Sequence, residues 1–594
     1  MIDQQLRRVL DQARQGVLSR RQCIERLLGL GLSMPMAGTL LMHAGVAQAQ
    51  SGFQYKPVRR GGGGTVRIIR SDAATLLNPH FATGLKDNFA CRIYYEPLAE
   101  WDADAKLVPV LAAAVPSREN GGVSADGRSV VWTLKKGVTW HDGTPFTADD
   151  VLFNWQYATD AATATVTIGS YARLRLEKID SHTVRVVFNK PTPFWPGEYC
   201  LVMLIPKHRF AGFMGARSRD ARENLEPVGT GPYRHADFKP ADSLRAELYP
   251  GYHQPLRPHF DRVEMKGGGE SLTAARAVLQ TGDYDLAAGV VADDELLRRM
   301  EAGGKGRVEF THGSATTAIF LNATDPAQEI DGERSHARTQ HPLWSDPALR
   351  RAFGLLIDRA GIQQHVFGRQ AVATANWVNN PPRYRSNALA MEFSIDKARQ
   401  LLDAAGWKLG ADGVRVKNGK RLAVLFQGSS GGVTEKYMTV VKSAAERAGF
   451  VMDLKIVQAS VFFSSDVANP DTYGKFNADI QTYNWSSGNP DPESMAQSFL
   501  SSQVASRANK WLGSNMVRWQ SAEYDALYSS AETELDPVRR AALFVRMNEL
   551  IATAGHAIPI LARAGARAIG ASLRLPLSPW APDTAGLAHW YRES

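Results

Sequence analysis

Short runs of β-branched and aromatic residues recur along the first part of the chain, with turn residues between them. The clearest runs, which predict β-strands, are Thr65–Ile69, Val130–Leu134 and Thr183–Phe188. His141–Pro145 has the composition of a turn. Thr147 follows it with an acid, Asp150, three residues later, the capping-box spacing that starts a helix. The region from 90 to 220 is therefore predicted to be rich in short strands.

The pattern changes beyond residue 320, where segments of helical period alternate with apolar runs of strand length. Pro347–Arg359 and Ile395–Gly406 predict helices, and Leu422–Phe426 and Met452–Val457 predict strands. Such alternation is typical of an α/β lobe. The chain has 594 residues, and single cores stop growing at about 250–300 residues, so more than one lobe is expected. We find no internal repeat.

Two polar or glycine-rich stretches interrupt this pattern. Arg59–Gly64 contains four consecutive glycines and predicts a flexible linker before the first strand. It is not a phosphate-binding loop, because it precedes a strand and lacks the Gly-Lys-Ser/Thr ending. The polar segment Thr324–Gln340 predicts a surface insertion.

The first 49 residues have the layout of an export signal. A polar segment with Arg20-Arg21 is followed by a mildly apolar stretch from Leu27 to Met42 and a small-x-small site at Ala47-Gln48-Ala49. The apolar stretch is short for a membrane span, which needs about 20 residues. The twin arginine resembles a Tat signal, although Cys23 stands where that pattern prefers Phe. We expect cleavage after Ala49 and a periplasmic mature protein; an N-terminal anchor or a basic amphipathic helix is the alternative.

Charge and cysteine content further restrict the class of protein that the sequence can represent. The net charge is +9, and without residues 1–49 it is +6, from 63 basic minus 57 acidic residues. The chain has no Lys/Arg run of the kind that binds nucleic acid, so we expect no nucleic-acid partner. Cys91 and Cys200 remain in the mature chain and could form a disulfide in an oxidising compartment, but sequence does not show that they meet.

Four separated segments, in order, resemble family 5 of the bacterial extracellular solute-binding proteins, the peptide- and nickel-type branch of ABC importers. The similarity covers residues 60 to 590. The segments that carry it are Tyr95-Glu96-Pro97-Leu98 with Trp132–Val151, Gly229-Thr230-Gly231-Pro232-Tyr233, Asp346–Arg359, and Asp396–Trp407.

The resemblance implies an α/β, two-lobe periplasmic-binding-protein fold (type II) with an extra domain in the first lobe. Carried across, residues 60–90, 225–318 and 560–594 form the core of lobe 1, residues 91–224 the extra domain, and residues 319–559 lobe 2. The ligand would be enclosed between the lobes. The His-Asp-Gly turn and the Asp149-Asp150 pair are interpreted as structural, since no catalytic third partner is evident.

The resemblance places the ligand beside the loop that follows a predicted strand, Ala478–Thr482. The candidate contacts there are Asn484, Trp485, Ser486, Ser487, Gly488 and Asp491. Trp485 matches the family's aromatic position and could stack on the ligand; a core role is the alternative. Di- and oligopeptide binders carry an Asp where this chain has Gly488, so their amine-binding device is missing. Asp491 could replace it, but Asp491-Pro492 also has the pattern of a helix N-cap, which we favour.

Asn376 and Trp377, in a Pro-rich segment, form a second candidate contact, with a surface turn as an equal alternative. Gly428–Gly432 fits G-x-S-x-G between a strand and a helix, so an exported serine hydrolase using Ser430 is the competing class. We expect no metal site and no cofactor, because no Cys/His cluster has ligand spacing.

The sequence thus predicts a non-enzymatic, monomeric binding protein that works with an ABC permease and ATPase. Its ligand is expected to be peptide-like. Opines, oligosaccharides and metal chelates remain open as alternatives, as does a sensor or chaperone role for the same fold.

Overall fold

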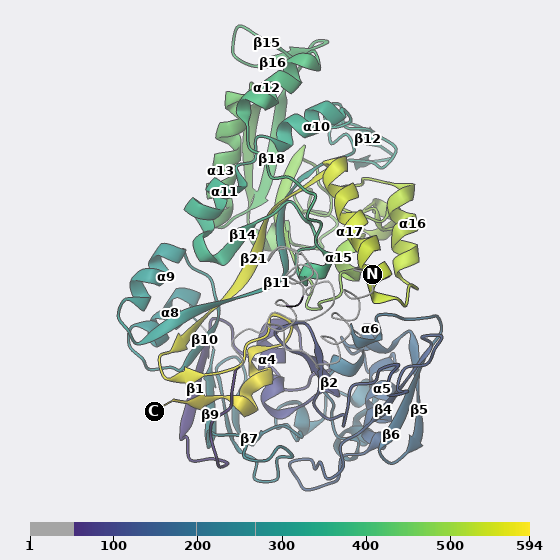
Figure 1. Ribbon diagram of the computed structural model, residues 1–594, viewed down its shortest axis with the longest axis vertical. Coiled ribbons are helices and arrows are strands. Elements are labelled where there is room, and N and C mark those ends of the chain that lie inside the picture. The colour runs from purple at the N-terminus through teal and green to yellow at the C-terminus, as the bar shows by residue number, and fades with distance from the viewer. Residues whose placement is uncertain (1–25, 27–52, 198, 268, 594) are drawn as a thin grey trace.

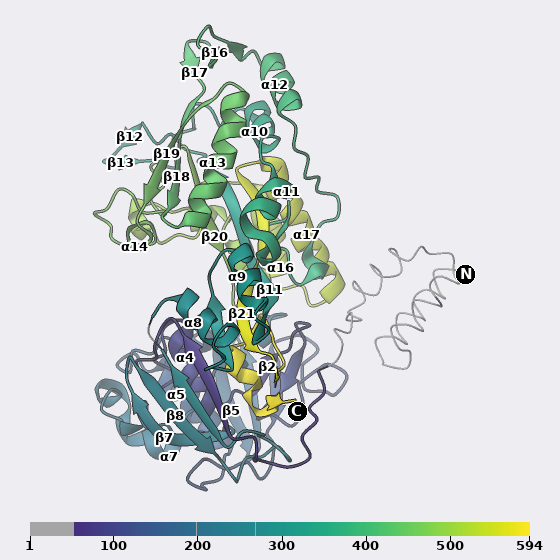
Figure 2. The ribbon, with the colours of Figure 1, turned by 90° about the vertical axis from the view of Figure 1, so that its left-hand side faces the viewer.

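The computed structural model describes residue 26 and residues 53–197, 199–267 and 269–593. Apart from Arg26, the predicted leader lies outside the described residues. Two lobes stand one above the other, joined by two long strands that run through both (Figures 1 and 2). No described helix is long and apolar enough to cross a membrane.

Eleven strands in the described part of the chain form one sheet that extends through both lobes. The order is β19-β18-β20-β11-β21-β10-β1-β9-β8-β7, and β14 also pairs with β21. The two shared strands are β11 (Gly306–Leu321) and β21 (Ala557–Gly570). They pair with each other along both lobes, and their register shifts between His312 and Thr316. The expected lobe boundary at 318/319 lies close to this break and stays a prediction.

Lobe 1 is the lower part in Figure 1. Its strands are β1 (Thr65–Arg70), β7 (Tyr233–Lys239), β8 (Ser243–Leu248), β9 (Arg262–Lys266) and β10 (Leu286–Val290). β1 runs parallel to β9 and β10. Helices α8 (Ser271–Leu279) and α9 (Asp294–Glu301) pack on one face, and α4 (Gly84–Tyr94) belongs to the core of the other.

A smaller sheet, here called the β4–β6 region, extends lobe 1 at the lower right of Figure 1. It consists of β4 (Ser129–Thr133), β5 (Leu174–Asp180) and β6 (Thr183–Phe188), with the hairpin β2 (Ala99–Trp101) and β3 (Leu107–Pro109) beside it. One continuous apolar core unites this region with lobe 1 and includes Val66, Trp132 and Trp590. The additional domain of lobe 1 therefore shares its core rather than standing apart.

The predicted helix start at Thr147 is confirmed. Helix α5 (Ala148–Thr159) has a complete capping box, in which the Thr147 hydroxyl accepts from the Asp149 amide at 3.3 Å. The Asp150 carboxylate accepts in turn from the Thr147 amide at 3.0 Å. Both acids therefore have structural roles. Asp150 completes the cap, and Asp149 pairs with Lys178 at 2.7 Å.

The segments of the first lobe that carry the family resemblance contact one another. His141 Nδ1 accepts a hydrogen bond from the Gly229 amide at 3.1 Å, and its Nε2 lies 3.1 Å from the Gly231 carbonyl. A Cβ on Gly229 would lie 1.8 Å from the Tyr94 carbonyl oxygen, so only glycine fits there. Glu96 accepts from the Thr230 hydroxyl at 3.1 Å. The structural interpretation of the His-Asp-Gly turn is confirmed.

The glycine run before β1 is not a flexible linker, and that prediction was wrong. The Gly61 and Gly63 amides donate to the carbonyls of Pro258 and His259 at 2.8 and 3.0 Å. A Cβ on Gly63 would lie 2.5 Å from the His259 ring. The glycines allow the backbone to approach this neighbouring segment closely, which composition does not distinguish from flexibility.

Lobe 2 has the predicted alternation of helices and parallel strands. Its strands are β18 (Ala423–Ser429), β19 (Val451–Val457) and β20 (Ile480–Trp485), with β14 (Ala371–Ala373) on β21. The core of one face includes α10 (Pro347–Gly354), α11 (Arg359–Ile362), α12 (Ile395–Ala404) and α13 (Gly432–Arg447). That of the other includes α15 (Glu493–Gln497), α16 (Ala522–Ala531) and α17 (Pro537–Ala554).

The segment expected to be a surface insertion is only partly exposed. It forms a short hairpin, β12 (Glu329–Ile330) and β13 (Glu333–Arg334), near the periphery of lobe 2. Thr324, Ser335 and Thr339 are buried within it. Its polar composition misled the prediction, because these side chains are hydrogen-bonded inside the lobe.

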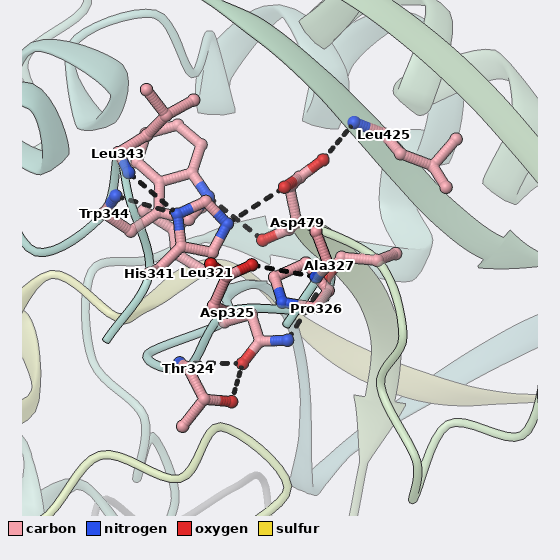
Figure 3. A network of polar contacts seen from close by, with 12 residues as sticks. Leu321, Thr324, Asp325, Pro326, Ala327, His341, Leu343, Trp344, Leu425 and Asp479 are labelled. Carbon is pink, nitrogen blue, oxygen red and sulfur yellow. Dashed lines mark hydrogen bonds and ion pairs between the residues drawn. The ribbon is translucent and has the colours of Figure 1, made fainter. Parts of the chain in front are cut away.

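A buried polar network fixes the strands of lobe 2 close to this segment (Figure 3). His341 Nδ1 accepts from the amides of Leu343 and Trp344, each at 3.1 Å, so Nε2 donates to Asp479 Oδ1 at 2.9 Å. The other carboxylate oxygen of Asp479 accepts from the Leu425 amide at 2.6 Å. His341 has no accessible surface, which indicates a structural rather than a catalytic histidine.

The two described cysteines do not form a disulfide. Cys91 and Cys200 are both buried thiols. Cys91 lies in α4, and Cys200 Sγ contacts the Pro196 carbonyl at 3.3 Å. Burial raises the pKa of the Cys91 thiol, which disfavours the reactive thiolate.

Candidate functional site

The carboxyl ends of the parallel strands in lobe 2 lie at one edge of its sheet. β18, β19 and β20 end at Ser429, Val457 and Trp485. Ligands of open α/β sheets bind in the crevice outside such strand ends. Lys436 in α13, the helix after β18, lies 3.3 Å from Asp293 in lobe 1, so this edge faces the other lobe.

Lobe 1 presents its own strand ends toward the same space. Asp293 comes three residues after the end of β10, whose parallel neighbour β1 ends at Arg70. Arg70 is buried over the Phe89 ring, 4.6 Å from its centroid, and pairs with Asp72 at 2.9 Å. The space between the lobes is therefore bounded by the carboxyl ends of parallel strands from both sides.

The predicted ligand loop begins at the end of β20, which runs three residues further than the predicted strand. Asn484, Ser486 and Gly488 are exposed, and Trp485 and Ser487 are partly buried. Trp485 packs at the edge of a lobe 2 core, with its ring 6.4 Å from that of Tyr483. The loop thus leaves the polar side chains of Asn484 and Ser486 and part of Trp485 accessible.

The hinge strand β11 anchors this loop. The Ser314 hydroxyl donates to the Ser487 carbonyl at 2.5 Å and accepts from the Ser487 amide at 2.7 Å. Ser314 lies in the register break of β11. The predicted ligand loop is therefore tied to the point at which the chain passes from one lobe to the other.

The neighbours of Gly488 do not require a glycine at this position. A Cβ at this position would meet nothing within 4 Å. Packing therefore does not require glycine here, and the missing acid that the family resemblance led us to expect at this position is not imposed by steric contact.

Asp491 does not supply the missing acid in this structure. Its carboxylate is buried, pairs with the Arg540 guanidinium, and accepts from the Glu493 amide at 2.9 Å. The second Arg540 contact, Nη2 to Oδ1, is 3.0 Å long. The favoured N-cap position was wrong by one residue, because α15 begins at Glu493 with Pro492 as its N-cap, although the Asp491 carboxylate still accepts from the first helical amide. The buried arginine partner was not foreseen.

Trp377 and Asn376 lie inside lobe 2 and not at a surface turn. Trp377 is 1% exposed, and its indole nitrogen donates to the Met495 carbonyl at 2.8 Å. Asn376 is bonded through both side-chain atoms to the backbone of Ser386, at 3.0 and 2.8 Å. In this conformation neither side chain faces the interlobe space, and their ligand role remains an untested prediction.

Ser430 has no triad partner among its described contacts. Its hydroxyl lies 3.4 Å from Gln458 Oε1 and accepts from the Ala459 amide at 3.2 Å. Neither a histidine nor a carboxylate is bonded to it within the described residues. The strand–loop–helix setting is as predicted, but the geometry gives no support to a nucleophile.

A cavity of about 370 Å³ opens between the β4–β6 region and lobe 2. Arg173 contributes from the β4–β6 region, and the remaining lining comes from lobe 2: Gln497, Leu500, Ser502, Gln503, Asp525, Tyr528, Ser529 and Glu532. Beside it, burial raises the pKa of Glu493, which accepts from the Tyr528 hydroxyl at 3.3 Å. Sequence reasoning missed this set, because no local motif links residues so far apart in the chain.

Beside this cavity, side chains of the segment after β6 contact lobe 2 directly. Lys190 Nζ and Glu532 Oε1 are 3.0 Å apart, and the Arg540 guanidinium lies 5.2 Å from the centroid of the Phe194 ring. Asn489 in the ligand loop donates to the Gly197 carbonyl at 3.2 Å. The segment after β6 therefore contacts lobe 2 near the loop with the predicted ligand contacts. Among the described residues, no group of three or more His, Cys, Asp or Glu could hold a metal ion.

The model of the bacterial extracellular solute-binding proteins, family 5, matches residues 106–507, more than half of the chain. The chain belongs to this family. The resemblance drawn from four motifs is thereby confirmed.

Two curated relatives show how far the similarity extends. Protein XP55 of Streptomyces lividans is 28% identical over 369 residues, which cover 60% of this chain and 60% of that protein. A putative ABC transporter peptide-binding protein of Brucella ovis is 24% identical over 479 residues, covering 79% of this chain and 81% of that protein.

A solved structure confirms the predicted fold class. The oligopeptide-binding protein AppA from Bacillus subtilis, in complex with a nonapeptide, superposes with a TM-score of 0.66 at 21% identity. The superposition covers 91% of this chain and 100% of that one. The two-lobe α/β arrangement is therefore shared along nearly the whole chain.

Proposed function

We propose that this protein is the substrate-binding component of an ABC importer, which captures a peptide or peptide-like molecule between its lobes and delivers it to a membrane permease. The observation that carries the proposal is the family match over residues 106–507. The Brucella relative is named as a peptide-binding protein, and AppA holds a nonapeptide. The ATPase of the importer would supply the energy for transport.

Capture would proceed by closure about the two long strands. β11 and β21 are the strands that run through both lobes, and the register break at His312–Thr316 offers a flexing point. Opening would separate Lys190 from Glu532 and Asn489 from Gly197. A ligand that contacts both lobes favours the closed state by its differential affinity.

The proposal includes export and the absence of catalysis. The leader would direct the chain to the periplasm and be removed after Ala49, and the mature protein would act as a monomer. The Ser430 hydroxyl contacts only Gln458 and Ala459 among its described polar partners, which supports a binding rather than a hydrolytic role. The ligand's identity within the peptide-like class is set by the loop after β20 and the adjacent cavity.

Native mass spectrometry of the mature protein, purified from the periplasm without denaturation, tests this function. We expect an adduct that is released on activation and has the mass of a short peptide or a peptide-like molecule. An adduct with a sugar or metal-chelate mass would contradict the peptide assignment and keep the transport role. Turnover of a serine-directed probe at Ser430 would contradict the binding role itself.

A further inference from the structure

Among the described residues, one arginine side chain at the junction of the lobes makes neither an ion pair nor a hydrogen bond, although its guanidinium lies over the Phe367 ring. Arg563 Nε is inaccessible to solvent and has no hydrogen-bond acceptor. Within the described part of the chain, its guanidinium makes no ion pair. Its Nη atoms are not among the buried unpartnered groups, so they retain contact with solvent. Arg563 therefore presents an unpaired charged end from a buried stem.

Three other buried arginines have acceptors for their guanidinium groups, whereas Arg257 also has an unpartnered Nε but donates through Nη1 to the Pro255 carbonyl at 3.2 Å. Arg359 donates to the carbonyls of Thr374 and Pro559, at 3.1 and 2.9 Å. Arg518 donates to four backbone carbonyls. Arg540 has a carboxylate partner. These three guanidinium groups each have acceptors within the fold, whereas Arg563 has none among the described residues.

The position of Arg563 places it between the lobes. On β21 it lies between Ala562 and Ala564, whose partners on β11 are Thr316 and His312, so it stands opposite the register break. Side chains alternate along a strand, so residues 563, 565 and 567 share one face. Residue 565 is an exposed glycine, and Arg567 is held by Asp583 and the Thr311 hydroxyl.

The Arg563 guanidinium packs against aromatic side chains. It lies 4.5 Å from the centroid of the Phe367 ring, and Phe367 lies 6.0 Å from the ring of Tyr437 in α13. Tyr437 follows Lys436, which reaches Asp293 of lobe 1. Arg563 therefore packs against side chains of lobe 2, on a strand that passes from one lobe to the other and beside β14, where it pairs with Ala371.

A guanidinium that is only partly solvated and has no acid partner is stabilised when it binds an anion. Burial lowers the pKa of Arg563, in the direction expected for a guanidinium without an acid. Arginine pairs with carboxylates through its planar fork of donors.

We propose that Arg563 is the anion-recognising residue of the interlobe site and takes a carboxylate of the ligand. This deepens the proposed function and rests on it for the peptide-like nature of the ligand. The carboxylate would be either the C-terminal group of a peptide or an acidic side chain.

The first test is the stability of the ligand-free protein. Arg563→Gln removes an unpaired charge, so its melting temperature in chloride buffer should equal or exceed that of the wild type. Arg385→Gln, which makes the same change at an exposed position of lobe 2, is the matched control. A melting temperature below that of both the wild type and the control would show a structural arginine and overturn the proposal.

The second test uses acetate as the simplest carboxylate. At equal ionic strength, replacing chloride by acetate should raise the melting temperature of the wild type and of Arg385→Gln more than that of Arg563→Gln. Equal rises in all three proteins would overturn the proposal, whether or not any peptide binds.

The third test distinguishes the sources of the carboxylate by calorimetry with tetraalanine, its C-terminal amide, and the amide with one alanine replaced by glutamate. The wild type should bind the free acid about tenfold more tightly than the amide, and Arg563→Gln should lose this difference. Recovery of affinity with the glutamate peptide would indicate a side-chain carboxylate. Equal binding of all three peptides by the wild type would refute the role of Arg563. If none of the peptides bound, the peptide function would be contradicted, and the acetate comparison would decide whether Arg563 binds a carboxylate.

Discussion

Two tryptophans that the sequence offers as equivalent ligand contacts have different environments. Trp485 is partly buried at the end of β20, whereas Trp377 is 1% exposed inside lobe 2. Trp485→Ala should therefore raise the dissociation constant of the natural ligand by about tenfold or more, since one stacking surface is lost. Titration calorimetry with the ligand recovered from the native protein measures this change.

The matched comparison is Trp377→Ala, which should leave a large cavity in the core and lower the free energy of unfolding by about 4 kcal/mol. Trp485→Ala should keep the melting temperature of the ligand-free protein nearly unchanged. If Trp485→Ala instead unfolded as readily as Trp377→Ala, Trp485 would be a core residue and its predicted ligand role would be lost.

His80 gives the protein a pH dependence at the residue scale. It is fully buried, its Nε2 donates to Asn154 Oδ1 at 2.8 Å, and burial lowers the pKa of His80 to about 4. The histidine pKa in the unfolded chain is about 6.5. Between these values the unfolded chain binds a proton that the native protein does not, so stability present at neutral pH is lost as the pH falls.

Accordingly, His80→Gln should reduce the loss of unfolding free energy between pH 7 and pH 5 by roughly 2 kcal/mol. Urea unfolding at the two pH values measures it, and His365→Gln, at an exposed position, should leave the wild-type loss intact. An unchanged loss in His80→Gln would show that His80 is protonated in the native protein at pH 5.

Among the elements, helix α5 shows how a local signal specifies a boundary. Thr147→Ala removes a hydroxyl that accepts from the Asp149 amide, and should lower the free energy of unfolding by about 1 kcal/mol. Chemical denaturation measures the loss. Thr439→Ala, the same substitution inside α13, should be neutral or slightly stabilising, because alanine favours helix interiors. Equal losses in both variants would mean that the Thr147 cap contributes nothing of its own.

For other elements, local composition predicts the structure less well, because contacts with a segment distant in the chain determine the conformation. The Gly61–Gly64 run has the composition of a linker, yet the His259 segment holds it by close backbone approach. Likewise β20 continues to Trp485, because pairing with Thr316 on β11 extends it beyond its apolar run.

For the whole molecule, closure should depend on the contact between the β4–β6 region and lobe 2. Lys190→Glu places two acids together at Glu532, so it should weaken ligand binding a few-fold, the scale of an exposed pair worth about 0.2–1 kcal/mol. Glu532→Lys should act similarly. The double exchange, Lys190→Glu with Glu532→Lys, should restore the affinity, as calorimetry with the natural ligand would show.

Small-angle scattering provides the structural check on the same variants. The radius of gyration of the wild type should fall when ligand saturates it, since the lobes approach one another. A double exchange that bound no better than either single variant would contradict the contact's role in closure, and a constant radius would contradict closure itself.

The sequence by itself determined the family, the alternating character of lobe 2 and the starts of helices such as α5, because these depend on motif order, periodicity and residues three positions apart. It also located the loop after β20. Only the tertiary structure decided which polar groups are already satisfied. Asp491 is neutralised by Arg540, 49 residues away, and Lys190 meets Glu532 across 342 residues. Such pairings arise from folding across the sheet and between lobes, and so does the lack of an ion-pair partner for Arg563 among the described residues, which no local pattern encodes.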